Sequence, residues 1–224
     1  MRCTATADRL RRICLRARGE GGFTLAELLV AMAILVVIIT SLTSVLVTAS
    51  RNQLDANNRF QAQEQARAGL DQLRRELHCA SAVTQTNGSP LAAGTAYNAI
   101  SATLSSACPS TGGAALFATW CTSASTLVTG DFALYRVTST STRPTCASTG
   151  KVKWADYLQP TTPGDSQPFC LPSTSTACTG GVVAPPMSLP MLHVTMPVNL
   201  NGPTSTIDGY NLVDDIALRN GTRS

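Results

Sequence analysis

Residues 22–40 read GFTLAELLVAMAILVVIIT, an apolar run with a single carboxylate, Glu27, close to its start. The stretch from Leu28 to Val47 is twenty residues long and uncharged, which is enough to span a bilayer as a helix. A carboxylate at the centre of such a helix costs roughly 2.5–3.5 kcal/mol, and less near the end. Glu27 is therefore a functional candidate rather than an ordinary membrane residue.

The basic residues of the chain are concentrated in front of this run. Residues 1–22 contain six arginines and two acids and so carry a net charge of +4, which is the net charge of the whole chain. The remainder is neutral in sum, so the charge gives no reason to expect nucleic-acid binding. A basic segment before an apolar span stays in the cytoplasm. We expect a single-pass protein of the cytoplasmic membrane, with its C-terminal part outside.

One long helix is predicted from about Thr24 to about His78. All 12 prolines lie at or after Pro90, and a proline inside a helix costs about 3 kcal/mol. Beyond Arg51 the pattern becomes amphipathic, with apolar residues at three- and four-residue steps. These apolar positions are Ala62, Ala66, Leu70, Leu73 and Leu77. The charged residues that occupy the remaining faces are Arg59, Glu64, Arg67, Asp71, Arg74, Arg75 and Glu76.

After Ser81 the composition changes to short apolar runs between polar loops rich in proline and cysteine. Trp120 and Trp154 fall within such runs, and we expect both in the core. The pattern predicts a small antiparallel sheet with long loops, and so an α+β fold. The predicted strands are 114–121, 125–129, 131–138, 151–158, 191–198 and 210–218.

Six cysteines follow the apolar run. An even number without CxxC pairs favours up to three disulfides over a metal site, with free buried thiols as the alternative. The sequence alone leaves every pairing open. The disulfide candidates are Cys79, Cys108, Cys121, Cys146, Cys170 and Cys178.

The stretch from Gly22 to Ala31, GFTLAELLVA, resembles the class III signal of type IV prepilins and type II secretion pseudopilins. The resemblance implies that a prepilin peptidase cuts between Gly22 and Phe23 and that the new amine of Phe23 is N-methylated. The apolar helix is then retained as the assembly element. Glu27 becomes the fifth mature residue, and our hypothesis is that it pairs with the cationic Phe23 amine of a neighbouring subunit.

The same resemblance implies a pilin-like lollipop, a long N-terminal helix followed by a small antiparallel β domain with disulfide-pinned loops. It divides the chain into a basic leader (1–22), a transmembrane assembly helix (23–50), an amphipathic continuation (51–80) and an extracytoplasmic β-rich domain (81–224). The implied partners are the prepilin peptidase and methylase, other pilin or pseudopilin subunits, and the inner-membrane assembly platform. The implied final location is a pilus or pseudopilus at the cell surface.

The length and the cysteine-rich loops favour a minor subunit that primes or tips a filament. Many major pilins bend the helix with a proline in the region that Ser44 occupies here. By the same resemblance, the filament that we expect is a type IV pilus, a type II secretion pseudopilus or a related DNA-uptake filament. The alternative is a single-pass anchored extracytoplasmic binding protein that never assembles, but this alternative gives Glu27 no role. A cleaved secretory signal would need a shorter apolar run.

Other chemistry has little support in the sequence. There is no GxSxG, Walker A or GxGxxG segment, so we expect no enzyme, no cofactor and no nucleotide binding. His78 and His193 lack paired metal-ligand spacing. The acids considered for calcium are Asp208, Asp214 and Asp215; they lack an EF-hand pattern and are expected to be solvated or to cap a helix. DNA or a surface ligand of the β domain stays open.

Overall fold

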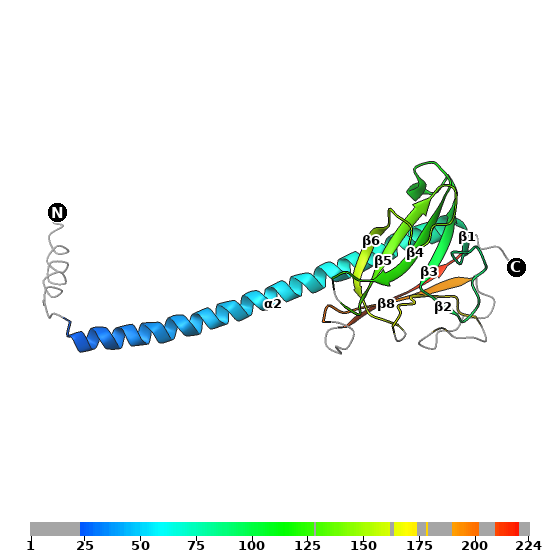
Figure 1. Cartoon of the computed structure of the whole chain (residues 1–224). Coiled ribbons are helices and arrows are strands. Elements are labelled where there is room, and N and C mark those ends of the chain that lie inside the picture. The colour runs from blue at the N-terminus through cyan, green and yellow to red at the C-terminus, as the bar shows by residue number, and fades with distance from the viewer. Residues whose placement is uncertain are drawn as a thin grey trace, which may run out of the picture. The chain divides into compact units, whose positions relative to one another are not determined.

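The structure is a computed structural model, and it describes residues 23–127, 129–161, 164–173, 178, 190–201 and 209–219 (Figure 1). The chain divides into two compact units between Leu54 and Asp55. The first unit holds the apolar part of one helix. The second holds the rest of that helix and a β sheet. The predicted leader, residues 1–22, lies outside the described residues, as does Asp208.

Helix α2 (Leu25–Cys79) has 55 residues and continues directly into β1 (Ala80–Thr84), as Figure 1 shows. Its bounds agree with the predicted helix to within one residue at each end. No proline interrupts it, and its single glycine, Gly69, lies in the half that packs against the sheet. A Cβ at Gly69 would lie 3.4 Å from Trp154 Cβ, so the helix approaches the strand closely there.

The second unit contains a nine-stranded sheet whose strand pairings are all antiparallel, as predicted. The strand order is β1-β3-β4-β5-β6-β8-β7-β2, and β9 pairs with β8 outside this path. A short 3-10 helix, η1 (Pro109–Thr111), precedes β4. The strands after β1 are β2 (Ala96–Tyr97), β3 (Ala99–Leu104), β4 (Leu116–Ala124), β5 (Phe132–Ser139), β6 (Val152–Leu158), β7 (Phe169–Cys170), β8 (Met191–Val198) and β9 (Tyr210–Ala217).

Five of the six predicted strands correspond to β4, β5, β6, β8 and β9. The predicted strand 125–129 is wrong for its described residues, because β4 ends at Ala124 and the chain turns back into β5. The Ser125 amide closes this turn by donating to the Asp131 carbonyl at 2.8 Å. Four strands were missed: β1, β2, β3 and β7. β2 and β7 have two residues each and show no period, whereas β3 is buried on successive residues and so does not alternate.

The core lies between α2 and the inner face of the sheet. The five predicted helix positions, Ala62, Ala66, Leu70, Leu73 and Leu77, are all buried there. Each fully buried leucine contributes about 1.5–3 kcal/mol. Trp120 is fully buried, whereas Trp154 is partly buried and packs against the same cluster.

The prediction that all charged residues of the helix lie away from the core is wrong for Glu76. Its exposed fraction is 0%, whereas the sequence placed it on a face away from the core. The carboxylate is buried because donors surround it: Arg136 Nη2 lies 2.6 Å from Oε1 and Gln72 Nε2 donates to the same oxygen at 2.9 Å. A buried charge persists only when it is paired in this way.

The six cysteines form three disulfides, so the expected disulfide-pinned domain is present. Cys79–Cys108 joins the end of α2 to the turn before η1, and Cys121–Cys146 joins β4 to the loop after β5. The third, Cys170–Cys178, closes a short segment that begins in β7.

Candidate functional site

The start of α2 is a capping box formed by Thr24 and Glu27. The Glu27 amide donates to Thr24 Oγ1 at 3.3 Å. In return, Glu27 Oε2 accepts from the Thr24 amide and from the Thr24 hydroxyl, both at 3.0 Å. The two residues satisfy backbone donors that every helix start leaves open. The sequence pattern T-x-x-E before an apolar run is a known sign of this cap. The three hydrogen bonds show that Glu27 has a role within its own chain, as part of its helix cap.

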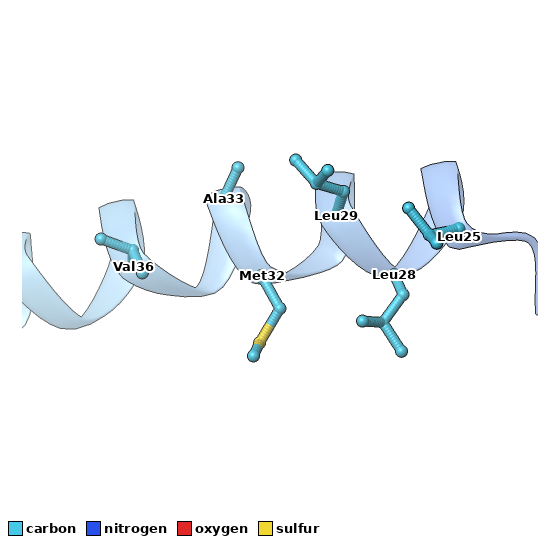
Figure 2. A pocket seen from close by; sticks show the side chains of 6 residues that line it. All are labelled: Leu25, Leu28, Leu29, Met32, Ala33 and Val36. Atoms are coloured by element: carbon cyan, nitrogen blue, oxygen red, sulfur yellow. The ribbon is translucent and has the colours of Figure 1, made fainter.

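The helix that follows exposes apolar side chains on every side. An 18-residue stretch of α2 has a mean hydropathy of 2.7 and is not buried, and α2 is the one helix among the described residues that is long and apolar enough to cross a membrane. Figure 2 shows six side chains that line a shallow apolar hollow near the start of α2: Leu25, Leu28, Leu29, Met32, Ala33 and Val36. Leu28 and Met32 project to one side, and Leu29 and Ala33 to another. Such a surface suits lipid or other apolar helices.

The hydroxyl groups in the second half of the apolar stretch are satisfied within the helix. Thr40 Oγ1 donates to the Val36 carbonyl at 2.9 Å, and Thr43 Oγ1 donates to the Ile39 carbonyl at 2.8 Å. Ser41, Ser44 and Thr48 make the same kind of bond to carbonyls three or four residues earlier. These residues therefore need no water or external partner, which keeps the segment compatible with an apolar environment.

The predicted processing site straddles the edge of the described residues. Gly22 lies outside them. Phe23 lies just before the helix and is 83% exposed. Because Thr24 caps the helix, Phe23 is the residue that precedes the cap. A cut before Phe23 would place its new amine one residue from the Thr24 amide to which the Glu27 carboxylate is bonded.

The described residues that were considered for metal binding are not grouped into a metal site, and two of them form ion pairs instead. Asp214 and Asp215 lie in β9, so the expected helix-capping role is wrong. Asp214 pairs with Arg74 at 2.7 Å, and Asp215 pairs with His193 at 2.7 Å. His78 lies in the last turn of α2. Within the described residues no three His, Cys, Asp or Glu side chains are grouped so as to hold a metal ion.

His193 of β8 is buried and forms a hydrogen-bonded chain with Asp215 of β9 and Thr195. Its Nδ1 contacts Asp215 Oδ1 at 2.7 Å, and its Nε2 contacts Thr195 Oγ1 at 3.0 Å. An acid, an imidazole and a hydroxyl in this order are also the parts of a nucleophilic triad. The adjoining cavity, however, has a volume of about 40 Å³ and is partly lined by Cys170 and Cys178. That volume is far below the several hundred cubic ångströms of a ligand pocket, so the geometry points to a structural contact between β8 and β9.

Comparison with protein families gives one match. Residues 17–43 match the model described as the prokaryotic N-terminal methylation motif. The chain therefore carries the class III signal of type IV pilins and pseudopilins, as the residues around Gly22 indicated. The members of this family are structural subunits, and no catalytic family matches. No curated protein and no solved structure matches the chain.

Proposed function

We propose that the protein is a structural subunit of a type IV pilus or a type II secretion-like pseudopilus, cut between Gly22 and Phe23 and N-methylated at Phe23. The observation that carries this proposal is the position of Glu27. Its carboxylate lies at the start of a helix that is apolar on all sides, within the methylation motif. In a plain membrane anchor the acid would serve only its own helix cap, and the methylation motif around it would have no use.

Glu27 has room for a second partner in addition to its own cap. Both hydrogen bonds to its carboxylate use Oε2, and Oε1 has no hydrogen-bond partner among the described residues. The ammonium group on Phe23 of a neighbouring subunit would bind there. The pairing would offset the desolvation of both charges as the subunit leaves the membrane. It would also set the axial offset between adjacent subunits.

The chain features favour a minor subunit that primes or tips the filament. A cut after Gly22 would leave a mature chain of 202 of the 224 residues. Its second unit has loops crosslinked by three disulfides. The assembly platform in the cytoplasmic membrane and a separate ATPase would drive polymerisation, since this sequence has no phosphate-binding loop.

The processing step is tested by intact mass and N-terminal sequencing of the protein recovered from its native membrane. We expect a chain that begins at Phe23 and is heavier by one methyl group. A chain that begins near Ser50 would mean ordinary secretion with loss of the apolar helix. A chain that keeps its leader would mean an anchored binding protein that does not assemble.

The assembly step is tested by Glu27→Ala, with Glu64→Ala as the matched control because Glu64 is an exposed acid on the same helix. We expect Glu27→Ala to insert into the membrane but to be lost from sheared filaments, whereas Glu64→Ala assembles like the parent. Assembly of Glu27→Ala at the parental level would remove the mechanism on which this proposal rests.

A further inference from the structure

A polar groove lies between the second half of α2 and β6, within the second unit. One wall consists of three side chains from α2, Asn58, Gln61 and Gln65. The other wall includes Lys153 and Tyr157 from β6. The groove has a volume of about 150 Å³, which is roughly half that of the smallest typical ligand pockets. It therefore has space for one ring-sized group rather than for a large ligand.

The helix wall is a row of free amide groups. Asn58, Gln61 and Gln65 follow steps of three and four residues, so they project from the same face of α2. All three side chains are exposed, and none has a hydrogen-bond partner among the described residues. Each amide offers both a donor and an acceptor without any charge. The row therefore presents alternating donors and acceptors to whatever occupies the groove.

The opposite wall is shaped by a bulge in β6. Two residues of β5, Phe132 and Leu134, pair with Leu158 and Ala155, so one extra residue lies between the pairs on β6. Within this bulge Tyr157 has φ of 60°, and it is the one non-glycine residue with positive φ among the described residues. A bulky residue in this region is strained. Bulges and strained residues of this kind gather where a side chain is redirected for a function.

The strained bulge is held by the buried carboxylate of Asp156. Its oxygens accept hydrogen bonds from Ser125 Oγ at 2.6 Å, from Lys153 Nζ at 2.6 Å and from the Tyr157 amide at 2.9 Å. Burial opposes the charge, but these three donors outweigh it and lower the pKa of Asp156. Asp156 therefore stays ionised and neutralises Lys153, so the pair adds no net charge to the groove.

We propose that this groove binds one neutral sugar residue of a glycan. A sugar ring presents hydroxyl groups that donate and accept at every edge, which matches the three free amides. Tyr157 supplies an aromatic group at the edge of the groove. An anionic ligand is disfavoured because Lys153 is already paired with Asp156. An apolar ligand would leave the amides without partners, which carries a desolvation penalty.

The test is saturation-transfer difference NMR on the full chain in lipid nanodiscs. The probes are the methyl glycosides of glucose, galactose and N-acetylglucosamine at millimolar concentration, and a capped alanine dipeptide serves as a peptide probe. We expect at least one glycoside to receive saturation from the protein. The double variant Gln61→Ala/Gln65→Ala should weaken its binding roughly tenfold, because two hydrogen bonds are lost.

The matched control is Gln53→Ala, since Gln53 is an exposed glutamine of the same helix that does not line the groove. It should bind like the parent. Absence of saturation for all three glycosides would overturn the proposal, and so would an undiminished signal in the double variant. Saturation of the dipeptide alone would mean a peptide site and would also overturn it. Filament assembly of the double variant is expected to be unchanged, so this result is independent of the proposed filament role.

Discussion

The indole Nε1 of Trp120 donates a 2.8 Å hydrogen bond to Oε2 of Glu76, and both residues are fully buried. Trp120 lies in the middle of β4, and Glu76 lies 44 residues earlier, in the last turn of α2. Since Arg136 of β5 contacts the other carboxylate oxygen, one side chain connects the helix to two neighbouring strands. This contact sets the position of the amphipathic helix half on the sheet.

Replacement of Glu76 is therefore expected to destabilise the β-rich unit strongly. Glu76→Ala leaves the Arg136 guanidinium and the Trp120 indole buried without an acceptor, and such a loss costs about 3–5 kcal/mol. Glu76→Gln keeps one acceptor and should cost less. Urea unfolding of the full chain in detergent, followed by tryptophan fluorescence, measures both. Glu64→Gln, at an exposed position of the same helix, is the control. Equal stability of Glu76→Ala and the parent would contradict the role given to this contact.

Gly69 should tolerate one methyl group and no more. A Cβ there would meet Trp154 Cβ at 3.4 Å and Leu134 Cδ2 at 3.5 Å, which are ordinary contact distances. Since alanine is more favourable than glycine in a helix interior by about 0.8–1 kcal/mol, Gly69→Ala is expected to stabilise the unit slightly. Gly69→Leu should destabilise it by about 1–3 kcal/mol, because the added atoms have no space. Thermal unfolding checks both predictions: the unfolding temperature should rise slightly for Gly69→Ala and fall for Gly69→Leu.

Asp131 is expected to weaken the fold as pH rises. Its side chain is 1% exposed, Oδ1 accepts from Gln159 Nε2 at 2.9 Å, and Oδ2 has no hydrogen-bond partner. Burial therefore raises the pKa of Asp131, and repulsion from the negative charge of Asp156 raises this pKa further. A group that binds its proton more tightly when folded contributes stability at low pH, and this is lost as pH rises through its folded pKa.

The Asp131→Asn variant removes this titration. We expect it to be more stable than the parent near neutral pH, with the difference shrinking toward acid. Denaturant unfolding between about pH 4 and pH 8 gives the difference in the free energy of unfolding between variant and parent at each pH. Asp71→Asn, at an exposed helix position, should give a flat curve. A difference that grows toward acid would show that the sign assigned to Asp131 is wrong.

The three disulfides should differ in their contribution to stability. Cys79–Cys108 and Cys121–Cys146 close loops of 29 and 25 residues, whereas Cys170–Cys178 closes one of 8 residues. In the chain-entropy model a loop near 15 residues is worth about 3 kcal/mol, and longer loops are worth more. We therefore expect paired Cys→Ser variants at Cys79/Cys108 to lose the most and those at Cys170/Cys178 the least. Denaturant unfolding of each double Cys→Ser variant measures how the three losses in free energy of unfolding rank. Peptide mapping under non-reducing conditions checks the pairing itself.

Much of the helical half was predictable because its determinants are local. The absence of proline, the apolar run and the three- and four-residue steps lie within one continuous segment, and helix formation depends on residues at such spacings. The predicted bounds and the five core positions from Ala62 to Leu77 agree with the structure for that reason. The capping box of Thr24 and Glu27 was not predicted, although it is equally local, since the two residues are three apart.

The sheet was less predictable because its partners are distant in sequence. Two-residue strands such as β2 and β7 exist only through pairing with distant segments. β2 pairs with β7, Ala96 with Cys170 and Tyr97 with Phe169, and β7 pairs in turn with β8. Their short runs carry no period that would identify them. The predicted strand at 125–129 fails for the same reason, since where a hairpin turns is decided by the register of its two strands.

By itself the sequence determined a methylation motif, an apolar helix with one acid, and an amphipathic helix followed by strands. These properties follow from residue type and short-range spacing, which do not depend on the rest of the chain. Only the tertiary structure decided which cysteines pair, that Glu76 is buried, and that Gln61 faces a strained bulge at Tyr157. Each of these depends on contacts between residues that are distant in sequence. Such contacts exist only once the sheet has its register and the helix packs against it.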